Sequence, residues 1–99
     1  MTQKLIEALT NAAIARSKFH NEILNSECVE LKKALEDAVY AFYSTGLEGL
    51  TKTPFIVDSA INEALDKTLF LLSLMKEKGI FDQKCEMALA DLACARSNG

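Results

Sequence analysis

Apolar residues recur every three or four positions along almost the whole sequence. This spacing gathers side chains on one face of an α-helix, whereas a half-buried strand needs apolar and polar residues to alternate over about four to eight positions. Residue types that favour helices also dominate the chain. The sequence therefore predicts an all-α fold. The first apolar series is Leu5, Leu9, Ala12, Phe19 and Ile23.

A second apolar series begins at Leu24, and it is out of phase with the first. At about 100° per residue, its face is rotated by about 100°. A single helix over 2–43 would be about 63 Å long and would need two packing surfaces, as in a dimer or an elongated hairpin. Alternatively, Asn25-Ser26 supplies an N-cap where the phase changes. We favour a break within 21–26. The second series is Leu24, Cys28, Leu31, Leu35, Ala38 and Phe42.

Turn residues divide the rest of the chain. The segment 44–53 contains two glycines and precedes Pro54, so we predict the principal loop there. Thr53 fits an N-cap, and the proline fits the first helical position because its missing N–H is not needed there. The next helix is expected over about 54–78.

Both ends of the following connection carry helix signals. Gly79 comes directly after a turn with two lysines, which is typical of a helix C-terminus. Asp82 then fits the N-cap of a last helix over about 83–96. The sequence thus predicts one domain over 1–99, a three- or four-helix antiparallel bundle, which we expect to be dimeric.

Composition and charge exclude several function classes. With 49% hydrophobic and 25% charged residues, the 99-residue chain is too apolar for a disordered protein. Its 11 Lys and Arg against 14 Asp and Glu give a net charge of −3, and Lys32-Lys33 is the sole adjacent basic pair. Binding to nucleic acid depends on neutralising phosphates. No nucleic-acid partner is therefore expected.

The sequence also predicts no membrane partner. The longest nearly apolar stretch, 69–75, is far shorter than the ~20 residues needed to span a bilayer. The first residues lack the continuous apolar core of a secretory signal. We therefore expect a cytoplasmic protein with free thiols.

The residues that could carry chemistry do not form a known motif. A mixed metal site of Cys28, Cys85, Cys94 and His20 would need short ligand gaps, but the two pairs are eight and nine positions apart. His20 is the sole conventional base for nucleophilic catalysis, and no phosphate-binding glycine loop is present. We expect no metal, no cofactor, no catalytic residue and no enzymatic activity.

Arg16 is the first anomaly, because it falls on the apolar stripe of the first series, one turn before His20. A guanidinium in a core is costly unless it reaches water or pairs with a carboxylate. The first interpretation is therefore structural: Arg16 lies at the edge of the core, where it reaches water or forms a salt bridge. The second interpretation is a site for an anion or small ligand formed by Arg16 and His20.

The second anomaly is the apolar back of the predicted 54–78 helix. After residue 68, Leu69, Phe70 and Leu74 project where polar residues stood before, so either the same chain or a second chain covers them. Tyr40 and Tyr43 flank the neighbouring stripe and suit an interface rim. These five residues are the predicted interface.

The sequence therefore predicts a small helical protein–protein interaction module. We expect a non-enzymatic adaptor, chaperone or regulator that acts as a homodimer and binds another protein. The alternative is a helical bundle that binds a small ligand or anion through Arg16 and His20. The discriminating observation is whether Arg16 is fully paired or faces a pocket.

Overall fold

The computed structural model describes residues 3–45 and 58–98, and this part of the chain is all-α with no strand. This confirms the prediction that the fold is all-α. The described residues form five helices: α1 (Gln3–Ser17), α2 (His20–Leu24), α3 (Val29–Ser44), α4 (Asp58–Lys78) and α5 (Gln83–Asn98). None of the described helices is both long enough and apolar enough to cross a membrane.

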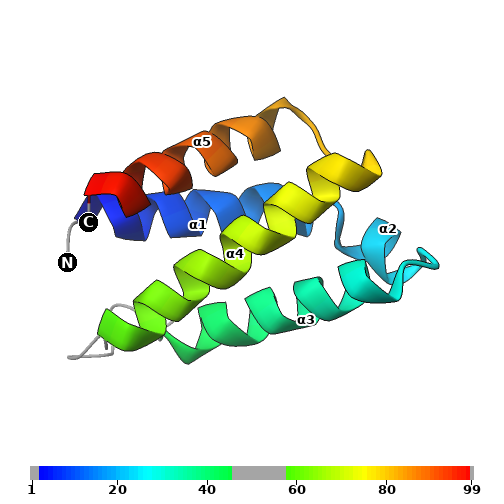
Figure 1. Cartoon of the computed structure of the whole chain (residues 1–99), viewed down its shortest axis with the longest axis horizontal. Coiled ribbons are helices and arrows are strands. Elements are labelled where there is room, and N and C mark those ends of the chain that lie inside the picture. The colour runs from blue at the N-terminus through cyan, green and yellow to red at the C-terminus, as the bar shows by residue number, and fades with distance from the viewer. Residues whose placement is uncertain (1–2, 46–57, 99) are drawn as a thin grey trace.

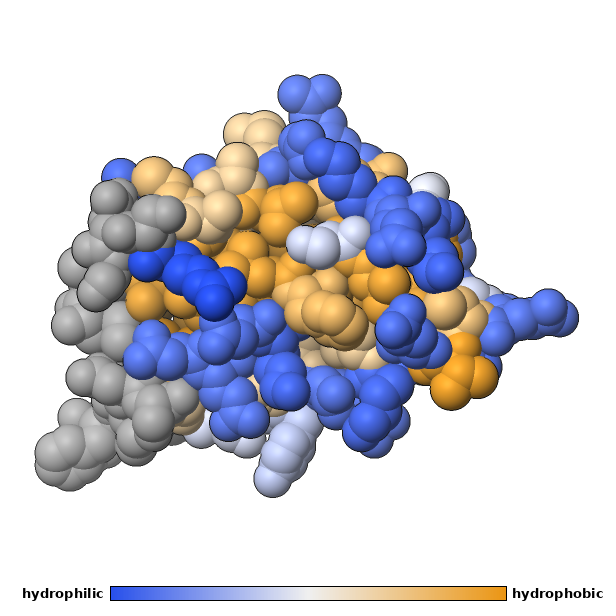
Figure 2. Space-filling model, viewed as in Figure 1, coloured by the Kyte–Doolittle hydropathy of each residue, from blue (hydrophilic) through white to orange (hydrophobic). Residues whose placement is uncertain are grey.

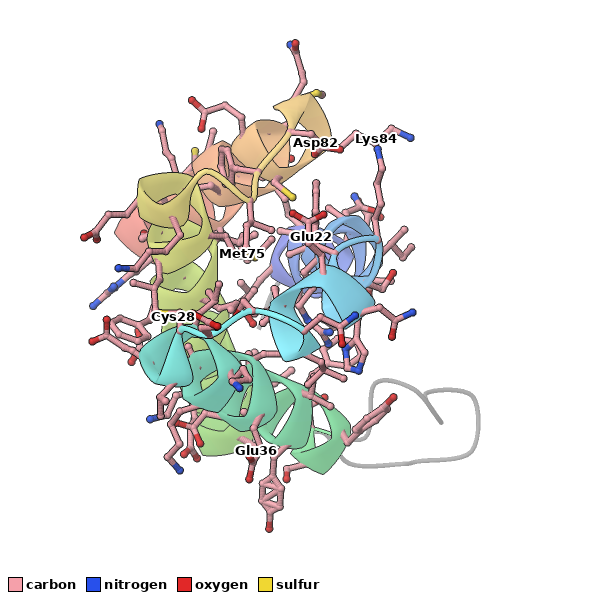
Figure 3. The ribbon with its side chains drawn as sticks, turned by 90° about the vertical axis from the view of Figure 1, so that its right-hand side faces the viewer. Glu22, Cys28, Glu36, Met75, Asp82 and Lys84 are labelled. Carbon is pink, nitrogen blue, oxygen red and sulfur yellow. The ribbon has the colours of Figure 1, made fainter. Side chains whose placement is uncertain are left out.

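The helices pack as two pairs that α4 connects. The α1 helix lies beside α5, and α3 lies beside α4, which also contacts both α1 and α5 (Figure 1). The short α2 packs on α3. Met75 of α4 is fully buried and points into the space between the helices, whereas Glu36 of α3 points away from them (Figure 3). The largest fully buried side chains are Leu9, Ile23, Leu31, Leu35, Ile61, Leu71, Leu72, Met75, Leu92 and Cys85.

The chain breaks twice between α1 and α3, on either side of the short α2. The predicted break is therefore present, and the continuous helix over 2–43 is wrong. The predicted cap at Asn25-Ser26 is also wrong, because the Ser26 hydroxyl donates to the carbonyl of Ile23 at 2.7 Å and so belongs to the turn after α2. The N-cap of α3 is Cys28, whose sulfur accepts the Leu31 N–H at 3.4 Å.

The ends of α4 and α5 follow the predicted signals. Gly79 has φ +80°, and the N–H groups of Gly79 and Ile80 donate to the carbonyls of Lys76 and Met75 at 3.2 and 2.9 Å. This is the Schellman pattern, in which a left-handed residue satisfies the last carbonyls of a helix. At the start of α5, the carboxylate of Asp82 accepts the Cys85 N–H at 3.0 Å.

The predicted principal loop is described only at its start. Ser44 is the last residue of α3 and Thr45 is its C-cap. The rest of the predicted loop and the predicted N-cap at Thr53-Pro54 lie outside the described residues.

Candidate functional site

Arg16 is buried in the last turn of α1, where its exposed fraction is only 6%. Burial lowers the pKa of its guanidinium because the charged form loses water, while nearby Tyr43 acts in the opposite direction. The carbonyl end of α1 also favours a positive charge, by about 0.3–1 kcal/mol for an exposed side chain and up to ~2 kcal/mol when partly buried. This gain is smaller than the cost of burying a charge without a partner.

No carboxylate pairs with Arg16 within residues 3–45 and 58–98. The ion pairs in this part of the chain join other residues. No described side-chain nitrogen is both sealed from water and without a hydrogen bond. The guanidinium forms no hydrogen bond with another residue of 3–45 or 58–98. We conclude that the aliphatic stem of Arg16 is buried while its nitrogens remain open to solvent.

Arg16 lines a concavity of about 430 Å³ between α1 and α3, the Arg16 pocket. Arg16 is the sole charged residue in the described lining. The hydroxyls of Thr10 and Ser17 donate to the carbonyls of Ile6 and Ile14 at 2.9 and 2.7 Å, so both hydroxyls keep only acceptor capacity. The described lining is Thr10, Ala13, Ile14, Arg16, Ser17, Phe42 and Tyr43.

The structure places Tyr43 near Arg16, while His20 lies elsewhere. His20 is the half-buried first residue of α2 and does not line the Arg16 pocket. The sequence placed His20 one turn beyond Arg16, but α1 ends at Ser17, so the helical spacing no longer applies. Only the packing of α1 near α3 brings Tyr43 to the pocket, and no spacing in the sequence signals this.

The five predicted interface residues do not share one surface. Leu74 is only 6% exposed, because α4 contacts three other helices and its apolar sector is covered within the chain. Leu69 is half-buried against the core. Phe70 and Tyr40 are 54% and 70% exposed, and Tyr43 lines the Arg16 pocket.

Phe70 is exposed on α4, which packs against α5. Two ion pairs join these helices, Asp66 with Arg96 at 3.6 Å and Lys76 with Glu86 at 3.2 Å. On α4, the half-buried Leu69 and the exposed Phe70 lie between Asp66 and Lys76 in sequence. On α5, the half-buried Leu89 lies between Glu86 and Arg96. Figure 2 shows hydrophobic side chains gathered over the middle of the molecule on this side, with hydrophilic side chains around them. We call Leu69, Phe70, Leu89 and the two ion pairs the Phe70 face.

A hollow of about 640 Å³ lies next to the Phe70 face, between α3 and α4. Ala34 contributes a small apolar side chain, and Phe70 itself lines one side. Tyr40 lines a smaller hollow that shares Asp37, Glu63 and Lys67 with the larger one. The described lining of the larger hollow is Ala34, Asp37, Asn62, Glu63, Asp66, Lys67 and Phe70.

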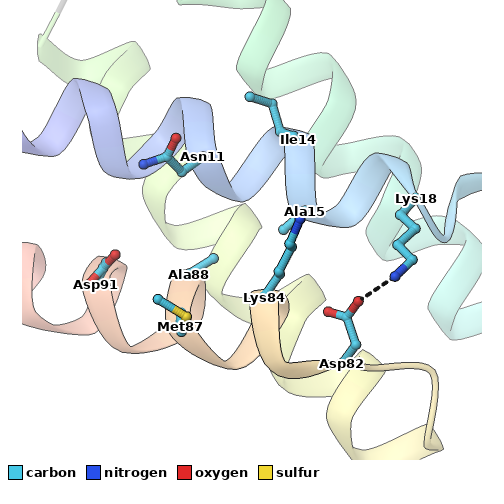
Figure 4. Close-up of a pocket in the computed structure, with 9 residues that line it drawn as sticks. All are labelled: Asn11, Ile14, Ala15, Lys18, Asp82, Lys84, Met87, Ala88 and Asp91. Atoms are coloured by element: carbon cyan, nitrogen blue, oxygen red, sulfur yellow. Dashed lines mark hydrogen bonds and ion pairs between the residues drawn. The ribbon is translucent and has the colours of Figure 1, made fainter.

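A third concavity, of about 440 Å³, lies between α1 and α5 (Figure 4). The exposed Ile14 and Met87 line it together with the small buried side chains of Ala15 and Ala88. The apolar stripes of the sequence did not predict this groove. Ile14 and Met87 lie outside the apolar stripes, which is the signal that could have found them.

An ion pair links α1 to the start of α5 beside this groove (Figure 4). Lys18 Nζ lies 3.0 Å from the Asp82 carboxylate. The pKa of Asp82 is lowered to about 2, first by the hydrogen bond from the Cys85 N–H and then by Lys18. The buried thiol of Cys85 lies 3.7 Å from the Ala15 carbonyl, and burial raises the pKa of this thiol.

The cysteines and His20 do not gather into a metal site. Cys28, Cys85 and Cys94 form no disulfide with one another, and among the described residues no three His, Cys, Asp or Glu side chains could hold one ion together. Comparisons with models of known protein families, with curated proteins and with solved structures give no match.

Proposed function

We propose that this chain is a protein–protein interaction module that acts as a homodimer through the Phe70 face. It works by binding and not by catalysis, and it serves in the cytoplasm as an adaptor, chaperone or regulator of a further protein. The observation that carries the proposal is Phe70, a large apolar side chain that is 54% exposed on α4 beside the hollow between α3 and α4. The three cysteines form no disulfide with one another, which agrees with a cytoplasmic setting.

The Phe70 face has the composition of an interface. Stable interfaces combine an apolar centre with a polar rim, and aromatic residues are enriched among their energetic anchors. Here Leu69, Phe70 and Leu89 form the centre, and the ion pairs supply the rim. Fully burying a phenylalanine is worth about 1.5–3 kcal/mol, and roughly half of that is still to be gained at Phe70 in each copy.

A second copy of this chain is the occupant that fits best. In a two-fold dimer the same patch meets itself, so a projecting side chain needs a recess close by on its own surface. Phe70 projects beside the hollow that contains Ala34, so each phenylalanine has a recess to enter in the partner. The charged residues of the described lining are Asp37, Glu63, Asp66 and Lys67, so Lys67 of one copy can meet a carboxylate of the other across the two-fold axis.

The test replaces Phe70 with glutamate. We expect wild type to sediment as a dimer and Phe70→Glu to weaken the dimer by more than tenfold, because two apolar anchors are replaced by charges. Helicity by circular dichroism should not change, since Phe70 is exposed in the folded chain. Met87→Glu is the matched control, with a 59% exposed apolar residue outside the Phe70 face.

Two results would overturn this function. A wild-type chain that stays monomeric at high protein concentration excludes self-association. If Met87→Glu dissociates the dimer as strongly as Phe70→Glu does, the dimer uses the α1–α5 groove instead of the Phe70 face.

A further inference from the structure

We propose that the Arg16 pocket binds a small organic acid, a monocarboxylate with an apolar body. This inference is independent of self-association, because the Arg16 pocket lies between α1 and α3 and shares no residue with the Phe70 face. It rests on the contacts of Arg16 and Tyr43, on the character of the lining and on its charge.

Arg16 supplies a fixed cation. Its buried stem holds the side chain in place, and within the described part of the chain its nitrogens have no carboxylate or hydrogen-bond partner. A guanidinium presents N–H groups as a planar fork that matches the two oxygens of a carboxylate. A side chain that is already immobilised loses little further freedom when the acid binds.

Tyr43 supplies a second donor beside the guanidinium. Its phenol makes no hydrogen bond with another described residue, and it lies close enough to Arg16 to affect the pKa of the guanidinium. The hydroxyl groups of Thr10 and Ser17 have used their protons on their own helix, so they present lone pairs. Lone pairs repel additional negative oxygens, and these two residues therefore limit how much negative charge the pocket accepts.

The charge of the lining selects a single negative charge. Within the described lining Arg16 is the sole ionised residue, so a dianionic phosphate would retain an uncompensated charge. A carboxylate neutralises the guanidinium in full. The pocket therefore favours carboxylates over phosphate monoesters.

The remaining lining favours an apolar body on the acid. Ala13, Ile14 and Phe42 contribute only apolar side chains, and the ring of Phe42 meets that of Tyr43 edge to face with centroids 6.3 Å apart. A volume of about 430 Å³ falls within the usual range for small-ligand sites, roughly 300–1,000 Å³. An aromatic or short aliphatic acid fits both the volume and these walls.

The experiment is isothermal titration calorimetry of the full chain with four probes. They are 3-phenylpropionate, hexanoate, the neutral analogue 3-phenylpropanol and inorganic phosphate. We expect both acids to bind wild type at least tenfold more tightly than the alcohol and phosphate. Amide chemical-shift changes on adding 3-phenylpropionate should concentrate at Thr10, Ala13 and Tyr43.

Variants then assign the interaction. Arg16→Met keeps the apolar stem and should weaken acid binding at least tenfold, while Arg96→Met removes an exposed arginine and should leave it unchanged. Tyr43→Phe should weaken binding severalfold, and His20→Asn should have no effect because His20 does not line the pocket.

The proposal is overturned if neither acid binds wild type at millimolar concentration, or if the alcohol or phosphate binds as tightly as the acids. It is also overturned if the shift changes map to the α1–α5 groove. Should Arg16→Met fail to fold, the probe comparison on wild type and the Tyr43→Phe variant still decide the outcome.

Discussion

Asp82 joins the cap of one helix to the end of another. Its carboxylate accepts the N–H of Cys85 and lies 3.0 Å from the ammonium of Lys18. Both contacts favour the ionised form and hold the pKa of Asp82 at about 2 in the folded chain, below the ordinary 3.8. The contribution of this charge to stability is therefore complete above about pH 3.8 and is lost as the pH falls towards 2.

The variant Asp82→Asn tests this linkage. Asparagine still caps α5, but it removes the charge that Lys18 and the helix N-terminus stabilise. We expect it to unfold at lower urea concentration than wild type at pH 7, with the difference shrinking as the pH falls from 4 to 2. Asp91→Asn, at a carboxylate that forms none of the ion pairs seen in the described residues, should show no such pH-dependent difference. A difference that stays constant down to pH 2 would contradict the linkage.

Single residues were predicted with uneven success. The helix signals at Gly79 and Asp82 act locally and were correct, because a cap and a left-handed turn depend on neighbouring residues alone. Arg16 was recognised as out of place on an apolar stripe. The position of Tyr43 near Arg16 was not predicted, because the two residues come together only through the packing of separate helices.

At the scale of helices, the start of α3 shows what sequence spacing missed. Sulfur is a weak acceptor, and cysteine is not among the preferred N-cap residues. A serine two positions earlier looked more suitable, yet the chain uses it to end α2. The phase change of the apolar pattern predicted where the first helix is interrupted. It did not predict whether a short helix forms within the interruption.

Substitutions at Cys28 should separate the cap from packing. Cys28→Val keeps a side chain of similar size but has no acceptor, and we expect it to lose about 0.5–1 kcal/mol of unfolding free energy. Cys28→Ser supplies a stronger acceptor and should be at least as stable as wild type. Ser26→Ala should change stability by less than about 0.5 kcal/mol. Urea unfolding gives all three values, and a larger loss at Ser26 than at Cys28 would contradict the assignment.

The end of α4 should depend on the conformation of Gly79 alone. A Cβ added there would meet no atom within 4 Å, so Gly79→Ala introduces no clash. The left-handed backbone nevertheless costs an L-residue about 1–2 kcal/mol, and we expect a loss of about 1 kcal/mol. Gly79→Asn should lose less, since asparagine tolerates this region better. Thermal unfolding that finds alanine and asparagine equally harmful would contradict this explanation.

At the scale of the whole molecule, α4 explains why the predicted interface was too wide. The apolar back after residue 68 has two possible explanations: other helices of the same chain surround this helix, or the helix faces a second chain. In this structure α4 contacts α1, α3 and α5, which buries Leu74 but leaves Phe70 half exposed. The amphipathic pattern of a helix gives its apolar sector, while the number of helices that cover the sector is a property of the assembled fold.

The pairing of α1 with α5 also determines how the molecule bears load. The start of α1 and the end of α5 lie at the same end of the molecule (Figure 1). A force applied between Gln3 and Asn98 therefore peels the two helices apart one turn at a time, and few contacts share the tension at any moment. The contacts at the far end of this pair, Lys18 with Asp82 and Ala15 with Cys85, are the last to carry it. Pulled in this direction, α1 and α5 separate turn by turn, and the contacts that α4 makes with both helices are loaded as they separate.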